Sequence, residues 1–401
     1  MKNIPIVIAA YNRPQTLQRL LKALERADYP QKVKLIFSID YSDRDEVVGI
    51  AKNFKWAFGD KEIIAHSQHL GLKKHILSCG DLSKDYDGVI LLEDDLYVSP
   101  VFYHYLSGAF DAYKDDRAIA GISLYAHGFN ETAAFPFIPL SDDSDVFFLQ
   151  IAASWGVCWS KDQWSRFRNW YAGRASASAM HQTILPGDVL RWPETSWKKH
   201  FIEYLIHSDT FFAYPRRSLT TNFGDSGEHH HAYSYFQVPL QYMKKEYRFK
   251  PFRDSLSVYD SFCEILPSRL SVLAPELATY DFVVDLYGMK PKEHYQHKHI
   301  LTIKQCRNVM FKYGRELLPA EINVIEQIKG DRIFFAEGKN CEGYENYRKH
   351  SKQRCTDMEE ISYYYNMKPV SSRAVSQYHT TWQPIPPSLL NIFQRKKKIR
   401  K

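Results

Sequence analysis

The feature that most constrains the fold of this 401-residue chain is an alternation of short apolar runs with helical patterns over its first 125 residues. Continuous apolar runs rich in β-branched residues are typical of strands buried in a parallel sheet. Leucines recur at helical spacing after the first run. The expected strands are Ile4–Ala10, Val33–Ile39, Glu62–Ala65, Val89–Leu92 and Ile119–Leu124. This rhythm predicts an α/β fold with a mostly parallel sheet and helices on both faces.

Polar residues follow three of these expected strands at the point where each strand ends. Asn12 and Arg13 follow the first strand, Asp40 follows the second, and the acids of "LLEDD" follow the fourth. Ligands of such sheets bind beyond the carboxyl ends of the strands. We therefore expect these residues to converge on one crevice.

The acids Glu93, Asp94 and Asp95 place three like charges at the end of a strand that looks buried. Like charges this close repel one another, and burying them without a partner is costly. A solvated turn would accommodate them. A carboxylate pair at a strand end can also hold Mg²⁺ or Mn²⁺, which would relieve the repulsion. On local grounds both interpretations are open.

The pattern changes along the chain and divides it into three expected parts. Residues 1–250 hold the α/β domain, residues 251–390 form an α+β extension of unknown role, and residues 391–401 are a basic tail. The tail contributes to a net charge of +7 and would suit an anionic membrane surface. A solubilising end is the alternative. Nucleic acid is not an expected partner, because the basic residues are not interleaved with aromatic ones along one element.

The cysteines and the apolar runs bear on the expected compartment. Six cysteines are scattered without a CxxC motif, and we expect them to be reduced thiols in a cytosolic protein. No apolar run approaches the ~18–20 residues that span a bilayer. The opening "MKNIPIVIAAYNRP" resembles a first strand more than a signal peptide. The expected location is the cytoplasm, at the inner face of the plasma membrane.

Several motifs in order resemble those of the GT-A nucleotide-sugar glycosyltransferases. The closest likeness is to bacterial family 2 enzymes and to the N-acetylglucosaminyltransferase I type. It covers roughly residues 1–240 and implies a GT-A fold, Rossmann-like, with a DXD-type acidic motif. The motifs are "VIAAYNRPQTLQRLLKAL", Asp40, "HLGLKKHIL", "LLEDDLYVSP", "SWGVCWSKDQW" and "YPRRSLTTNFGDSGEHH". An acidic triplet alone is weakly specific, whereas this ordered series is specific.

The resemblance also implies roles for the acidic triplet and for one late histidine. Asp95 is similar to the direct ligand of Mn²⁺ or Mg²⁺ in the family, and His229 to the histidine that completes the metal shell. Asp94 and Glu93 would contact ribose, sugar or metal-bound water. For His229, a solvated His-rich turn in "EHHH" is the alternative.

A second set of implied roles concerns the donor and the acceptor. Asn12, Arg13 and Asp40 would line the nucleotide pocket. Trp155 and Gly156 match a glycine-containing acceptor loop, in which backbone close to the sugar needs a small residue.

The catalytic base does not follow the family's pattern. Inverting transfer needs a carboxylate to take the proton of the acceptor hydroxyl. In "GDVLRWPETSWKKHF" the aligned position holds Thr195 or Ser196, which cannot act as a base. Glu194 is the favoured candidate, Asp188 the second, and a structural role for both is the third alternative.

The expected function is therefore a metal-dependent, inverting glycosyltransferase of the hexosyltransferase type. It would move a sugar from a nucleotide-sugar donor, a UDP-sugar, to a glycan or lipid-linked glycan in polysaccharide biosynthesis. The alternative is a catalytically inactive protein that binds nucleotide-sugars or carbohydrate, which the uncertain base favours.

Overall fold

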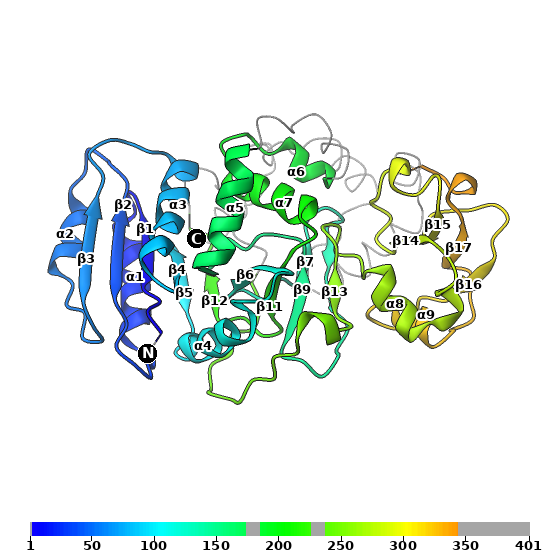
Figure 1. Cartoon of the computed structure of the whole chain (residues 1–401), viewed down its shortest axis with the longest axis horizontal. Helices are drawn as coiled ribbons and strands as arrows, with labels where there is room; N and C mark the ends of the chain where they lie inside the picture. Colours follow the sequence, from blue (N-terminus) through cyan, green and yellow to red (C-terminus); the bar gives the residue numbers. More distant parts are fainter. Residues whose placement is uncertain (1, 174–184, 226–236, 344–401) are drawn as a thin grey trace, which may run out of the picture. The chain divides into compact units, whose positions relative to one another are not determined.

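The structure is a computed structural model that describes residues 2–173, 185–225 and 237–343 (Figure 1). The chain divides into two compact units, Met1–Cys341 and Glu342–Lys401. All helices and strands named below belong to the first unit. The predicted metal ligand His229 and the basic tail, residues 391–401, lie outside the described residues.

A nine-stranded sheet forms the centre of the first unit, in the order β13-β9-β11-β6-β10-β4-β1-β2-β3. Strands β1, β2, β3 and β4 are mutually parallel, whereas β10 runs antiparallel between β4 and β6. The bounds are β1 Ile6–Ala10, β2 Leu35–Ile39, β3 Lys61–Ala65, β4 Gly88–Glu93, β6 Ile119–Ser123, β9 Val146–Leu149, β10 Val157–Ser160, β11 Phe211–Pro215 and β13 Val258–Tyr259. The prediction of a mostly parallel sheet is confirmed, and its strands lie within about two residues of the expected ranges.

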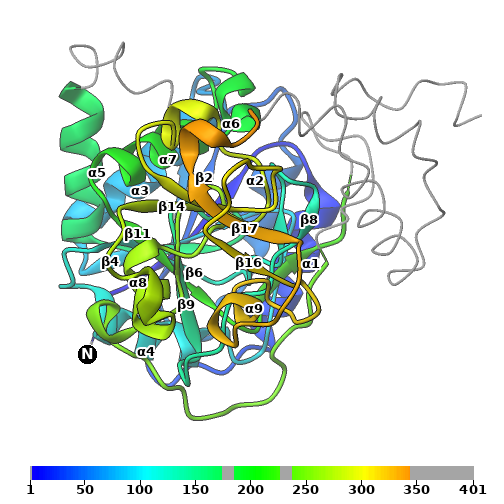
Figure 2. The same cartoon turned by 90° about the vertical axis from the view of Figure 1, so that its right-hand side faces the viewer.

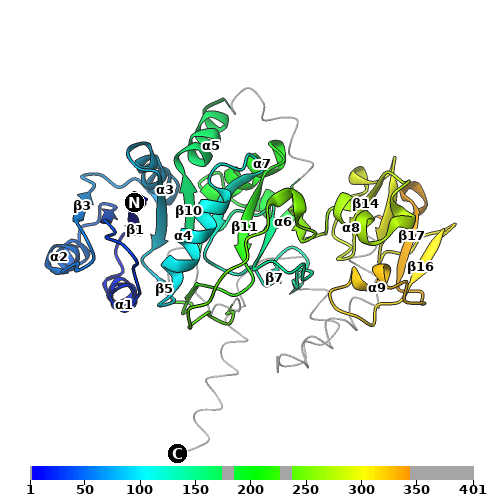
Figure 3. The same cartoon turned by 60° about the horizontal axis from the view of Figure 1, so that its bottom comes forward.

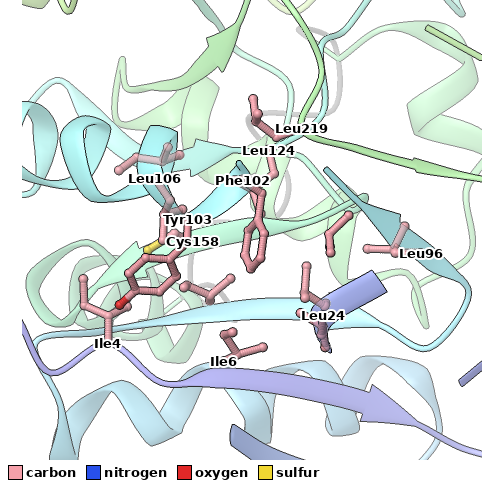
Figure 4. Close-up of a cluster of buried hydrophobic side chains, with 14 of the residues drawn as sticks. Ile4, Ile6, Leu24, Leu96, Phe102, Tyr103, Leu106, Leu124, Cys158 and Leu219 are labelled. Carbon is pink, nitrogen blue, oxygen red and sulfur yellow. The ribbon is translucent and has the colours of Figure 1, made fainter. Parts of the chain in front are cut away.

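One face of the sheet is covered by α1 (Pro14–Glu25), α2 (Glu46–Asn53) and α4 (Phe102–Tyr113). Helix α1 begins with a proline, whose fixed φ suits a first helical turn. Its leucines lie on one face and join a single buried cluster with α4 and β1. Figure 4 shows Leu24 of α1 and Phe102 of α4 in this cluster, near Ile6 of β1.

The other face is covered by α3 (Leu72–Asp81), α5 (Lys161–Gly173) and α7 (Trp197–His207), which Figure 3 shows around β10 and β11. Aromatic rings fill the space between these helices and the sheet. Phe167 of α5 stacks on Phe201 of α7 with ring centroids 4.2 Å apart, and Trp159 of β10 lies 4.6 Å from Trp164. Helices on both faces are thus confirmed, and part of the chain's aromatic content is core packing.

A two-stranded ribbon brings a distant segment next to the acidic triplet. Strand β5 (Leu96–Val98) starts directly after Asp95 and pairs antiparallel with β12 (Thr220–Asn222). Asn222 is the register partner of Leu96. The segment after β12 therefore begins beside the acids.

The region from about residue 260 to Cys341 has its own four-stranded mixed sheet, in the order β14-β15-β17-β16 (Figure 2). Strands β14 and β15 are parallel, and the other pairs are antiparallel. The elements are α8 Pro267–Leu273, β14 Phe282–Asp285, β15 His299–Thr302, β16 Phe311–Tyr313, α9 Ile322–Ile325 and β17 Ile333–Glu337. This mixture agrees with the expected α+β class of the extension.

The expectation that all six cysteines are reduced thiols is wrong for one pair. Cys306 and Cys341 face each other in an isolated antiparallel bridge, with Cα atoms 4.0 Å apart, and form a disulfide. They lie 35 residues apart in sequence, and only the folding of the second sheet brings them together. Cys79, Cys158 and Cys263 are free and buried.

Within the described ranges, no helix combines the length and the apolar character needed to cross a membrane.

Candidate active site

The turn after β1, the end of β2 and the end of β4 meet at one edge of the sheet. Parallel pairing aligns Ala9 with Glu93 and Ala10 with Ile39, so the polar residues after these strands are neighbours. The backbone N–H of Asp40 donates to the Ala10 carbonyl at 2.9 Å, and that of Asp94 to the Ala9 carbonyl at 3.1 Å. The predicted convergence of these strand ends is present in the structure.

Arg13 lies directly on the acidic triplet. Its Nη1 is 2.9 Å from Oδ2 of Asp95, and its Nη2 forms an ion pair with Asp94. The backbone N–H of Tyr11 also donates to the Asp94 carboxylate, at 3.3 Å. The Asp94 side chain is 2% exposed and that of Asp95 is 22% exposed. Asp95 is therefore the acid of this ion pair that a ligand in the crevice reaches more easily.

Burial and mutual repulsion change the titration of these groups. Burial, with added repulsion from Asp95 and Asp94, raises the pKa of Glu93 to about 8 against the attraction of Arg13. Burial likewise raises the pKa of Asp94 to about 6, although Arg13 opposes the shift. Burial alone would lower the pKa of Arg13, but the two aspartates raise it above its ordinary value. One guanidinium is thus shared between two carboxylates.

The residues at this edge fit a hard divalent cation. Carboxylate oxygens are the ligands that Mg²⁺ and Mn²⁺ prefer, and Asp95 presents its carboxylate toward solvent. Among residues 2–173, 185–225 and 237–343, no three His, Cys, Asp or Glu side chains are grouped to hold a metal. The described residues would then supply one or two carboxylates to such a site, and the role of His229 stays a prediction.

Asp40 organises the loop that leads into α3. Its carboxylate accepts hydrogen bonds from the backbone N–H groups of Leu70 (2.8 Å) and Gly71 (3.0 Å), and His69 Nδ1 lies 3.1 Å away. Gly71 has a φ of +72°, which a glycine adopts without strain. The His69 ring lies 5.1 Å from that of Tyr11. Asp40 thus holds His69, whose ring lies beside that of Tyr11, and the direct contact of Asp40 with a nucleotide stays a prediction.

Asn12 lies half-buried between Tyr11 and Arg13 in the turn that joins β1 to α1. This position places it at the same edge of the sheet as Asp94, whose carboxylate accepts from the Tyr11 N–H. Its role in the nucleotide pocket stays a prediction.

Trp155 and Gly156 form a turn that rests on β12. The Thr220 hydroxyl donates to the Trp155 carbonyl at 2.5 Å, and the Trp155 ring meets Tyr125 edge-on at 4.7 Å. Gly156 has a φ of +89°, and a Cβ there would lie 3.0 Å from the Thr220 methyl group. Because β12 pairs with β5, this turn is tied to the strand that follows Asp95. Contact with an acceptor stays a prediction.

The two candidate bases have different surroundings. Glu194 is exposed, and its carboxylate forms an ion pair with Lys199 at 2.9 Å. Its backbone carbonyl accepts hydrogen bonds from Lys73 (2.6 Å) and His200 (2.9 Å). Asp188, on the short helix α6 (Gly187–Arg191), accepts a hydrogen bond from the Thr132 hydroxyl at 2.7 Å. Neither assignment is tested by these contacts.

The sequence interpretation missed a second arginine at this edge. Arg19 of α1 forms an ion pair with Asp225, and its Nη2 lies 3.4 Å from the carbonyl oxygen of Asp95. Its guanidinium lies 4.1 Å above the ring of Phe223. Asp225 follows β12, which belongs to the two-stranded ribbon and not to the parallel sheet, so the rule used for Asp40 does not extend to it.

Lys198 was also missed. It is half-buried in the first turn of α7. Its charge weakly opposes the rise in the pKa of Glu93 that burial causes, and it adds to the fall in the pKa of the buried His127. Burial is the larger cause for His127 and lowers its pKa to about 3. No motif in the sequence relates Lys198 to the acidic triplet.

A comparison with protein families finds a match in the first part of the chain. Residues 6–159 match the family described as glycosyl transferase family 2, from the first residue of β1 to β10. This segment is therefore similar to glycosyl transferase family 2. The predicted resemblance to GT-A glycosyltransferases and the predicted enzyme class are confirmed, while the relation to the N-acetylglucosaminyltransferase I type stays a prediction. A search of curated proteins found no significant match.

Several solved structures share part of their chain trace with this protein at low similarity. TarS of S. aureus has a TM-score of 0.34 at 12% identity, over 55% of this chain and 36% of that one. Its fragment 1–349 in complex with UDP has a TM-score of 0.35 at 11% identity, over 55% of this chain and 60% of that one. GalNAc-T7 with UDP, GalNAc and Mn²⁺ has a TM-score of 0.37 at 12% identity, over 53% of this chain and 42% of that one. The chain thus spans 36% to 60% of the length of these proteins. Scores and identities this low transfer no ligand or activity to this chain.

Proposed function

We propose that this protein is a metal-dependent, inverting glycosyltransferase that moves a sugar from a UDP-sugar to a hydroxyl of a glycan or lipid-linked glycan. The observation that carries the proposal is the meeting of Arg13 with Asp94 and Asp95 inside the segment that is similar to glycosyl transferase family 2. It combines acidic and basic side chains at the carboxyl edge of a parallel sheet, where ligands of such sheets bind. Assembly of a polysaccharide is the process that we infer.

The chain's own residues would bind the two ends of the donor. The guanidinium groups of Arg13 and Arg19 suit a diphosphate, because their planar forks pair with phosphate oxygens. His69, which Asp40 holds in place, and the neighbouring Tyr11 would lie against the base or ribose. A divalent ion at Asp95 would neutralise the charge that develops on the leaving diphosphate.

Proton transfer from the acceptor hydroxyl requires a carboxylate, and we favour Glu194. Its exposed carboxylate is held by Lys199, which would keep it in one orientation. Glu194→Gln should lower the turnover number about 100-fold or more, since general bases contribute about that much. Asp188→Asn is the matched change, and we expect a smaller effect because Asp188 is engaged with Thr132. The reverse order of effects would assign the base to Asp188.

The proposal is tested by incubating the full chain with a panel of UDP-sugars and Mn²⁺ and measuring release of UDP. Release that is abolished by a chelator and restored by Mn²⁺ is the expected result. Thermal unfolding with the same panel identifies donors that bind, because a ligand of the folded state raises its apparent stability. Donor binding without turnover, with any acceptor, would instead identify a nucleotide-sugar-binding protein without catalysis.

The location that we infer is the cytoplasmic face of a membrane that carries the acceptor. It rests on the basic tail, where every residue from Arg395 to Lys401 except Ile399 is Lys or Arg. Such residues gain roughly 1 kcal/mol each near an anionic surface. Deleting residues 391–401 should weaken binding to vesicles that contain an anionic lipid, and salt should weaken binding of the full chain. Equal binding by both chains would remove the tail's role.

A further inference from the structure

The guanidinium of Arg13 occupies the carboxylates that a metal ion would need. Its two terminal nitrogens divide between the acids, with Nη1 2.9 Å from Asp95 and Nη2 on Asp94. A guanidinium fork matches such a pair well, because it donates parallel hydrogen bonds in a fixed plane. In this arrangement Arg13 is the counter-ion of the acidic pair.

A divalent ion and this guanidinium compete for the same carboxylates. Both are cations, and at a few ångströms in a partly buried site their repulsion is large compared with thermal energy. Asp94 is almost wholly buried, so solvent screens the repulsion poorly. Metal binding at Asp95 therefore favours movement of Arg13 away from that carboxylate.

The position of Arg13 gives its guanidinium a second partner when a donor binds. It precedes α1 at the carboxyl edge of the sheet, and its side chain is 26% exposed. A diphosphate in this crevice would offer oxygens that compete with Asp95 for the same fork. Arg19 lies nearby but pairs with Asp225 and reaches only the backbone carbonyl of Asp95, so it does not compete for the carboxylates.

We propose that Arg13 is an internal counter-cation that holds Asp94 and Asp95 until the donor diphosphate draws it away, which couples metal binding to donor binding. The coupling rests on the proposed function, since it needs a diphosphate donor and a metal at one site. By linkage it is reciprocal: UDP raises the affinity for the metal by the same factor as the metal raises the affinity for UDP.

The test measures Mn²⁺ binding to the full chain by electron paramagnetic resonance. Without nucleotide, Arg13→Gln should tighten Mn²⁺ binding about tenfold, which corresponds to about 1.4 kcal/mol. UDP should tighten Mn²⁺ binding strongly in the parent and much less in this variant. Arg13→Lys keeps the positive charge but lacks the planar guanidinium, and its Mn²⁺ affinity should lie between those of the parent and Arg13→Gln.

Arg19→Gln is the matched control, because it removes an arginine at the same edge without freeing either carboxylate. It should change Mn²⁺ affinity in the absence of nucleotide less than Arg13→Gln does. Equal tightening by both substitutions would show a general charge effect and overturn the proposal. So would unchanged or weaker binding to both Arg13 variants, provided that thermal unfolding shows them folded.

The outcomes also separate this inference from the proposed function. Tighter Mn²⁺ binding to Arg13→Gln, together with no turnover of any UDP-sugar by the parent, would support the counter-cation and contradict the transferase. Turnover by the parent, together with parent-like Mn²⁺ affinity in Arg13→Gln, would do the opposite. Absence of Mn²⁺ binding to every variant, with or without UDP, would overturn both the metal role and the coupling.

Discussion

Two clusters of acidic and basic side chains in this molecule differ in how their charges are matched. At the sheet edge, one guanidinium is shared between Asp94 and Asp95, and the latter is 22% exposed. In the second sheet, Lys304 pairs with Asp285 at 2.7 Å with both side chains fully buried, and Lys290 pairs with Asp260. The first cluster has fewer cations than carboxylates in its ion pairs, whereas the second has one lysine for each aspartate.

The third acid of the buried cluster completes this balance. Burial raises the pKa of Glu264 well above its ordinary value, with added repulsion from Asp285, which favours the uncharged form of this carboxyl. The lysine ammonium groups are also hydrogen-bonded to backbone carbonyls, that of Lys304 to Lys290 at 2.6 Å and that of Lys290 to Val284 at 2.7 Å. A matched, closed cluster supports the fold, and an unmatched, open one is suited to bind a cation.

The largest expected effect is loss of activity in Asp95→Asn. This change removes the exposed carboxylate of the unmatched cluster, and we expect transfer to fall about 1,000-fold, or about 4 kcal/mol in the barrier. Release of UDP from the donor measures it. Asp87→Asn is the control, because Asp87 precedes β4 at the opposite end of the strand, where it accepts a hydrogen bond from Asn3. Equal losses in both variants would contradict the comparison.

The next effect is loss of stability in Lys304→Met. It leaves Asp285 buried without its ammonium partner, which typically costs about 3–5 kcal/mol of unfolding free energy. Urea unfolding measures the loss. UDP release per folded molecule should stay near that of the parent, since this cluster has no role in the proposed reaction. A variant that is stable but inactive would place the buried cluster in the catalytic machinery.

Most of the site's framework could be predicted because it follows from local pattern. Apolar runs that alternate with helical spacing fix a parallel sheet, and a parallel sheet places the residues after β1, β2 and β4 at one edge. The approach of Asn12, Arg13 and Asp40 to the acids needs no knowledge of distant contacts.

What could not be predicted depends on contacts between residues far apart in sequence. Arg19 and Asp225 are 206 residues apart, and Cys306 and Cys341 pair only because the second sheet folds. The hydrogen bonds of Asp40 to the loop before Gly71 follow from a left-handed glycine that no periodicity reports. The sequence does not indicate that Lys304 is buried against Asp285, because lysine and aspartate usually lie on the surface.

A third expected effect concerns the buried carboxyl of Glu321. It is smaller than the two effects above and changes the free energy of unfolding with pH. Burial raises the pKa of Glu321 from its ordinary value of 4.5 to about 7, and the Tyr259 hydroxyl donates to it at 2.8 Å. The folded state thus holds this proton more tightly than the unfolded one. The stability that it contributes is complete below pH 4.5 and is lost as pH rises through 7, in total about 3 kcal/mol.

Glu321→Gln should remove this contribution, because the amide can still accept from Tyr259 but does not titrate. The difference in unfolding free energy between about pH 5 and pH 8 should be smaller in the variant than in the parent, by urea unfolding at each pH. Tyr259→Phe is a useful companion, since it removes the hydroxyl that donates to Glu321. The same pH dependence in parent and Glu321→Gln would show that another group carries it.

The smallest expected effect comes from removing both charges of the matched pair. Lys304→Met with Asp285→Asn leaves no unpaired ion, and Asn still accepts the N–H of Lys290 that now donates to Asp285 at 2.9 Å. The double variant should therefore lose only about 1–2 kcal/mol of unfolding free energy, less than Lys304→Met alone, because the effects of substituting two charges in contact are not additive.

At the unmatched cluster, Arg13→Gln combined with Asp95→Asn should recover none of the activity that Asp95→Asn loses, since a cation site needs its carboxylate. Recovery of activity in the double variant at the sheet edge would contradict the role assigned to that cluster. Failure of the second double variant to recover stability would contradict the role assigned to the buried cluster.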